Sequence, residues 1–195
     1  MTALCDYAEP CNDYGVLRLP IRKLTLLLLG LVLSAGTITA TSTAASAATP
    51  TPAAVALSVL QAMNTSRARA GLPPLKSNAV LVRTAHSHSL KMAAHNTMTH
   101  QFYGELTLGG RITSQIIVPH VRWVYAAENI GWSSRMDTVG ALGIEAMMMA
   151  EKAPYDGHKR NILSRSVTQV GIDVVFDTVH HRIWLTEDFA KFNNG

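Results

Sequence analysis

Residues 169–189, QVGIDVVFDTVHHRIWLTEDF, decide the fold expected for this chain. The first half of the stretch alternates, with apolar residues at Val170, Ile172, Val174 and Phe176. A period of two residues is typical of a strand with one buried face. Residues 177–181 predict a turn, and residues 183–189 supply a partner strand. The stretch therefore predicts an antiparallel hairpin.

Helical spacing dominates the sequence that comes before this hairpin. Apolar positions three and four residues apart predict helices over residues 55–70, 78–95 and 137–152. Between the last two, residues 101–123 contain several glycines and predict loops with one short helix at 111–117. Helices in the first two thirds and strands in the last third indicate an α+β domain, because a parallel crossover sheet would need the two to alternate.

The amino-terminal 47 residues are typical of a secretory signal peptide. Basic residues precede an apolar run at residues 24–33, and Ala45-Ser46-Ala47 predicts cleavage before Ala48. The apolar run is shorter than the about 20 residues that cross a membrane, which disfavours the alternative of an uncleaved membrane anchor. The long, partly acidic start also fits translation beginning near Val16. We expect a Thr/Pro tether at residues 48–52 and one domain over 53–192.

Cysteine and charge place further bounds on the exported domain. Cys5 and Cys11 are the two cysteines of the chain, and both lie before the expected cleavage point. The mature domain would therefore contain no disulfide and would depend on its core for stability. Removing the segment takes away three basic and three acidic residues, so the net charge stays at +4. These charges are scattered, which argues against a nucleic-acid partner and allows weak attraction to an anionic cell envelope.

Four residues carry the chemistry that the sequence offers: His100, Glu128, Glu151 and His158. Two imidazoles and two carboxylates suit a divalent cation such as Zn²⁺ and leave positions open for water. With a glutamate as general base, this set is the minimum for metal-assisted hydrolysis. The sequence lacks a His-Glu-x-x-His helix, so spacing alone does not fix a reaction. The alternative is that the histidines pair with the glutamates as buried structural contacts.

Five motifs in one order resemble the CAP superfamily, also called the SCP/PR-1-like family. They are Asn64–Arg67 with Gly71–Leu75, then His100, Ala127–Ile130, Gly157–Leu163 and Trp184–Phe189. The resemblance covers residues 53–192 and implies a three-layer α-β-α sandwich with a central antiparallel sheet. The absence of cysteine from this region is similar to the bacterial, disulfide-free branch.

The resemblance also implies a site. Its cleft tetrad of two histidines and two glutamates falls on His100, Glu128, Glu151 and His158, with the two histidines as ligands of a divalent cation, often zinc. Glu145 is an alternative to Glu151, because both lie on the same expected helix. The chain departs from the family pattern at Ala127, where glycine is usual, and at Met148, where tryptophan is frequent.

Several neighbouring residues have a structural and a functional interpretation. Asn129 and Asn161 follow site residues and either position them or satisfy loop backbone. His88 and His95 share a helical face, where a core or surface role is expected. The aromatic side chains near Glu128 either pack in the core or line a cleft; they are Trp123, Tyr125 and Trp132.

Three functional classes remain compatible with these residues. One is a secreted domain with a cation site, whose catalytic version would be a hydrolase of peptide-like bonds using Glu128 or Glu151. The others are a lipid or sterol binder and a module that binds a cell-envelope component. We expect a monomer. Fold-level analogy does not choose among these classes.

Overall fold

The computed structural model describes residues 2–6 and 50–194 of the 195-residue chain. The expected signal peptide lies outside this part except for its first residues, so its cleavage stays a prediction. Within residues 2–6 and 50–194, no helix combines the length and the apolar character that crossing a membrane requires.

The three predicted helices are present, and the first of them begins three residues earlier than predicted. Helix α1 (Pro52–Arg69) begins at Thr51, whose side chain accepts a hydrogen bond from the Ala54 amide, and it is followed by Gly71 at a φ of +68°. Helix α2 (Ala79–His95) begins at Asn78 and ends at the left-handed Asn96. Helix α4 (Thr138–Ala150) begins at Asp137, as predicted, and ends two residues earlier than expected.

The hairpin is also confirmed. Strands β4 (Gln169–Asp177) and β5 (Arg182–Asn194) pair antiparallel from Gln169↔Ala190 to Asp177↔Arg182. Strand β5 is the middle strand of a five-stranded sheet with the order β1-β3-β5-β4-β2. Strand β2 (Lys76–Ser77) joins β4 in parallel, while β1 (Thr2–Asp6) and β3 (Val121–Ser133) extend the antiparallel part.

Several elements differ from the sequence prediction, which contains neither β1 nor β2. The sequence does not predict strand β3, which places a strand in the middle of the chain instead of only in the last third. Its pattern is hidden because Glu128, Asn129 and Ile130 are all buried, so apolar and polar residues do not alternate. Helix α3 (Leu108–Gln115) begins three residues earlier than predicted, and the short helix α5 (Gly157–Ile162) has no counterpart in the prediction.

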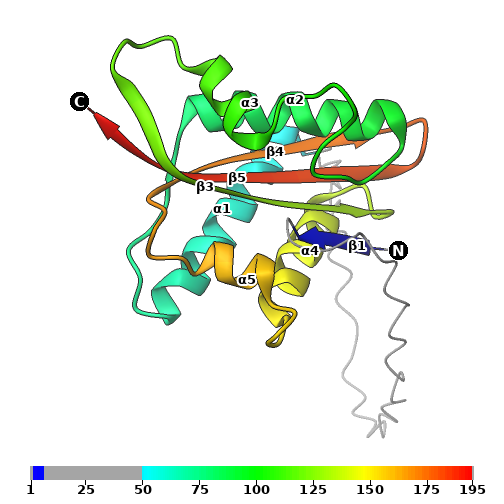
Figure 1. The fold of residues 1–195 in the computed structure, drawn as a ribbon. Helices are drawn as coiled ribbons and strands as arrows, with labels where there is room; N and C mark the ends of the chain where they lie inside the picture. Colours follow the sequence, from blue (N-terminus) through cyan, green and yellow to red (C-terminus); the bar gives the residue numbers. More distant parts are fainter. Residues whose placement is uncertain (1, 7–49, 195) are drawn as a thin grey trace, which may run out of the picture. The chain divides into compact units, whose positions relative to one another are not determined.

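The helices cover both faces of the sheet, which confirms the expected three-layer sandwich. Figure 1 shows α2 and α3 on one face and α1, α4 and α5 on the other. The larger core lies on the α1 and α4 face, where Val55, Val59 and Met63 pack against β4 and β5. Burying each large apolar side chain contributes about 1.5–3 kcal/mol.

On the opposite face, α2 approaches the sheet so closely that only a glycine fits beneath it. A Cβ atom on Gly171 of β4 would lie 2.0 Å from the Leu81 carbonyl carbon of α2. This contact fixes the height of α2 above the sheet, and with it the start of the segment that carries His100.

Candidate functional site

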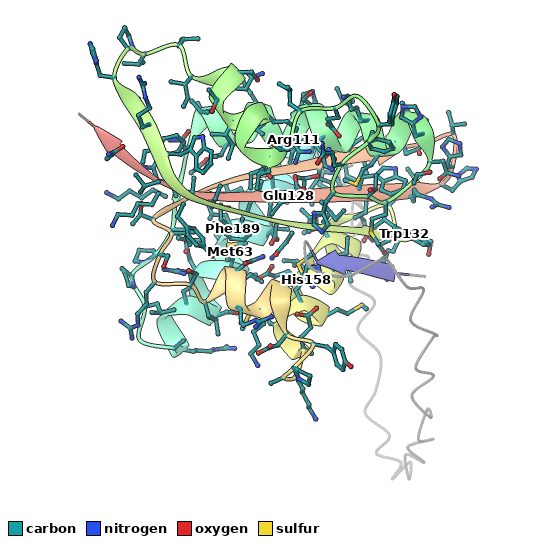
Figure 2. The ribbon with its side chains drawn as sticks, viewed as in Figure 1. Met63, Arg111, Glu128, Trp132, His158 and Phe189 are labelled. Atoms are coloured by element: carbon teal, nitrogen blue, oxygen red, sulfur yellow. The ribbon has the colours of Figure 1, made fainter. Side chains whose placement is uncertain are left out.

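The four residues singled out in the sequence form two histidine–carboxylate pairs, one on each side of β3. His100 lies between α2 and α3, and its Nδ1 is 2.8 Å from Oε1 of Glu128 on β3. His158 lies in α5, and its Nδ1 is 2.5 Å from Oε1 of Glu151, which caps the end of α4. Figure 2 shows Arg111 on the α2 and α3 side of the sheet, Glu128 on β3 and His158 on the opposite side.

Glu128 is fully buried, and both of its carboxylate oxygens are engaged. Oε1 accepts from His100, and Oε2 accepts from the Arg111 guanidinium. Burial by itself would raise the pKa of this carboxyl, but the hydrogen bond from His100 and the charges of His88 and Arg111 outweigh it and lower the pKa below its ordinary value. Glu128 is therefore ionised, and its two hydrogen-bond partners fix the position of its carboxylate.

Arg111 is the centre of a buried polar cluster that sequence reasoning missed. Its Nη1 donates to the His100 carbonyl at 2.9 Å and lies 3.2 Å from Nδ1 of His88. Glu105 lies 3.1 Å from the same His88 nitrogen. Arg111 comes from the glycine-rich segment whose pattern predicts mainly loops, and no linear spacing connects it to Glu128.

His88 has the core role that is expected for it. The ring is fully buried, and Nε2 is 2.8 Å from the Thr99 carbonyl oxygen. Because that oxygen can only accept, Nε2 carries a proton, while Nδ1 lies between the Glu105 carboxylate and the Arg111 guanidinium. His88 thus holds the segment just before His100.

Glu151, and not Glu145, contacts His158. Besides its bond to the ring, the Glu151 carboxylate accepts from the Lys159 amide at 3.3 Å, and its side chain is 16% exposed. Glu145 is buried in the core beside Glu187 of β5. The pair on α4 and α5 is therefore the one that the motif resemblance indicates.

Two asparagines join the two pairs. Asn129 Nδ2 is 3.1 Å from Oε2 of Glu187 and 3.3 Å from the His158 carbonyl oxygen. Asn161 Nδ2 donates to Asn129 Oδ1 at 2.9 Å. These amide contacts tie α5 to β3 directly next to Glu128, so both asparagines have a positioning role that is also structural.

Additional buried carboxyls lie beneath the site on β5, and they do not stand out in the sequence. Burial, followed by the negative charge of Glu128, raises the pKa of Asp188 well above its ordinary value. Burial, followed by the charge of Glu145, does the same for the pKa of Glu187, and burial raises the pKa of Glu145 to about 7. Three buried carboxyls with raised pKa values therefore lie near Glu128, a carboxyl whose pKa is lowered.

A cavity of about 1200 Å³ opens beside the pairs, between α3, β3 and α5. Its walls include Trp123 and Tyr125 of β3, and it reaches Ala127 and Gly157, which neighbour Glu128 and His158 in the chain. Tyr125 is 39% exposed. Tyr125 thus has the cleft role, Trp123 both lines the cavity and packs against the core beneath α3, and Trp132 packs against Trp184.

The two pairs fit part of what a metal site requires. A carboxylate that accepts from Nδ1 fixes the tautomer and the orientation of an imidazole, which is how ligating histidines are held. His100 and His158 both have this arrangement. In the part of the chain that the structure describes, no three or more His, Cys, Asp or Glu side chains form a ready metal-binding group. A cation here would depend on two imidazoles and water.

Comparison with known sequences identifies the family. Residues 60–189 match the family described as CAP, the cysteine-rich secretory protein family. The chain belongs to this family. The match spans β3, β4, most of β5 and both histidine–carboxylate pairs of the CAP domain. No curated protein sequence matches the chain significantly.

Solved structures show the same fold. An extracellular protein containing an SCP domain from Bacillus anthracis is 24% identical with a TM-score of 0.57, over 72% of this chain and 41% of that one. An outer surface protein from Borrelia burgdorferi is 15% identical with a TM-score of 0.57, over 69% of this chain and 90% of that one. The chain thus spans less than half the length of the Bacillus anthracis protein.

Proposed function

We propose that this CAP domain acts outside the cell and binds a divalent cation between His100 and His158, with Zn²⁺ as the ion that suits its donors. The observation that carries the proposal is the shared geometry of the two pairs, in which each imidazole is held through Nδ1 by a carboxylate. Such second contacts orient a ring toward a metal and raise its basicity.

The extracellular part of the proposal is supported by the signal-like sequence of residues 1–47 and by the extracellular and outer-surface descriptions of its structural neighbours. The lack of cysteine in the CAP domain is compatible with export, because the buried core provides its stability.

When bound, a cation at this position would polarise a ligand or acidify a water molecule. The residues of the chain limit the chemistry available to it. Glu128 is fully buried against the Arg111 guanidinium, so a substrate does not reach it and its role is to position His100. In a hydrolytic version of the function, the base would be Glu151, because its side chain is 16% exposed to solvent even though it also contacts His158 and Lys159.

The test is calorimetric titration of the purified 195-residue protein with Zn²⁺. We expect binding of one ion, lost in a His100→Ala/His158→Ala double variant whose circular dichroism is unchanged. The matched control is His180→Ala/His181→Ala, which removes two histidines of the β4–β5 turn that could bind zinc independently. Binding that survives the first double variant, or that disappears only in the second, would overturn the proposal.

The cavity supports a second candidate, the binding of an apolar ligand against Trp123 and Tyr125. We expect a fatty acid or a sterol to change the tryptophan fluorescence in a saturable way. The Tyr125→Ser variant should not show this change. The His100→Ala/His158→Ala protein should still bind this ligand, because neither histidine lines the cavity. An unchanged fluorescence signal at micromolar ligand would exclude this candidate.

A further inference from the structure

The outer edge of the sheet at residues 129–133 of β3 lies outside the cavity lining and begins at Asn129, directly after Glu128. In the order β1-β3-β5-β4-β2, β1 is the strand that covers β3 on its outer side. The pairing is antiparallel and runs from Thr2↔Ser133 to Asp6↔Asn129. Figure 1 shows this short strand lying along β3 next to α4. It comes from the far end of the sequence and contributes a backbone ladder.

The segment of β3 beneath it lacks the features that usually protect an open strand. Edge strands are blunted by charged side chains, proline or a bulge. Residues 129–133 read Asn-Ile-Gly-Trp-Ser and contain no charge and no proline. The only register shift in the β3–β5 pairing lies at Trp123/Tyr125, at the other end of the strand. This edge is therefore competent to pair with any extended chain.

The strand that fills the edge belongs to the segment that the sequence marks for removal. Thr2–Asp6 lies within residues 1–47, the expected signal peptide. The inner partner of the same β3 residues is β5, from Asn129↔Glu187 to Ser133↔Ile183. With β1 removed, residues 129–133 would keep β5 on one side and lose the β1 ladder on the other.

We propose that the edge of β3 from Asn129 to Ser133 is a docking site for an extended peptide segment of a protein partner, uncharged where it faces residues 130–133, which adds to the sheet antiparallel to β3 at the position that β1 occupies in the intact chain. Main-chain hydrogen bonds supply affinity in this mode of recognition. The site tolerates variation in the peptide sequence, because the hydrogen bonds of the ladder involve only main-chain groups. It disfavours charged side chains, because α4 and β3 lie against the added strand. The inference does not depend on the cation.

A labelled peptide with the sequence of residues 2–8 and serine in place of Cys5 tests the proposal on the full chain. In the intact protein, the tethered strand competes at an effective concentration on the order of millimolar, so the added peptide should bind weakly or not at all. In an Ala3→Pro/Leu4→Pro variant, at least one proline removes a ladder donor whatever the register of the hydrogen bonds, which frees the edge. We expect about tenfold or stronger binding of the peptide to this variant.

Two controls separate strand addition from other binding. Two peptides are N-methylated, one at the odd and one at the even residues, so each keeps its side chains and loses half of its main-chain donors. The peptide that loses the donors facing β3 should not bind. Amide hydrogen exchange of residues 129–133 should be fast in the proline variant and slow again when the peptide is added. Equal binding to the intact and proline proteins, or equal binding of both methylated peptides and the parent, would overturn the proposal.

Discussion

Asn161 Nδ2 donates to Asn129 Oδ1 over 2.9 Å, and this bond connects α5 to β3 between the two histidine–carboxylate pairs. Asn129 is fully buried and also contacts Glu187 and the His158 carbonyl. The relative position of the pairs therefore depends on amide groups that belong to neither pair.

Replacing Asn129 by leucine should destabilise the protein and disturb the site at the same time. The change leaves Glu187 and the His158 carbonyl without this donor, and each unsatisfied buried group costs about 1–3 kcal/mol. Urea unfolding measures the loss. Asn193→Leu is the control, because Asn193 is exposed on β5; similar losses in both variants would show that the amide bridge has no special role.

Removing the Arg111 charge should be more costly than any exposed arginine change. Arg111→Met leaves Glu128 ionised and buried without its partner, and breaking a buried pair in this way costs about 3–5 kcal/mol. Arg122→Met, on the exposed part of β3, should change stability by less than about 0.5 kcal/mol. If the Arg111→Met and Arg122→Met proteins unfold at the same urea concentration, Glu128 is not held by Arg111.

The buried Glu145–Glu187 pair predicts a loss of stability as pH rises. Burial raises the pKa of Glu145 to about 7 from an ordinary value of 4.5, and raises that of Glu187 as well. The folded state thus retains protons that the unfolded chain releases. The stabilising contribution is fully present below pH 4.5 and is lost as the pH rises through about 7.

Thermal or urea unfolding measured across this pH range tests the sign. Glu145→Gln should flatten the decline, because glutamine has no proton to lose. Glu105→Gln serves as the comparison, since the pKa of Glu105 is lowered despite burial, by contacts with Phe102, His88 and Arg111, and its contribution changes below pH 4.5. A slope that Glu145→Gln leaves unchanged would show that this pair does not govern the decline.

Two separate glycine substitutions test the distance between α2 and the sheet. Gly171→Ala places a Cβ within 2.0 Å of the α2 backbone, so α2 must move, and overpacking of this kind costs about 1–3 kcal/mol or more. Gly143→Ala lies in the middle of α4 with nothing within 4 Å, and should stabilise by about 0.5–1 kcal/mol. Calorimetric melting should therefore shift in opposite directions, and a shared direction would contradict the close approach.

The sequence predicts the elements whose patterns are local. Asn78 and Asp137 cap their helices where the sequence predicts, α1 begins three residues before its predicted start, and alternation locates the β4–β5 hairpin. Strand β3 is missed because its second half is buried on both faces and carries Glu128 and Asn129 in the core, which removes the period of two.

The site is predictable only in part for a related reason. Motif resemblance places His100, Glu128, Glu151 and His158, and the structure brings each histidine to the expected glutamate. Arg111 meets Glu128 through tertiary packing of α3 over the sheet, and the buried acids of β5 meet it through strand register, Glu128↔Asp188. Neither contact corresponds to a regular spacing in the sequence, so neither could be predicted from it.

The position of β5 also governs when this protein can fold. The last strand in the sequence is the middle one of the sheet, and both β3 and β4 form their ladders against it. Until residues 182–194 are available, β3 and β4 have no middle strand to pair with, and the sheet against which α1 and α2 pack stays incomplete. The last strand of the sequence is thus the one that closes the sheet.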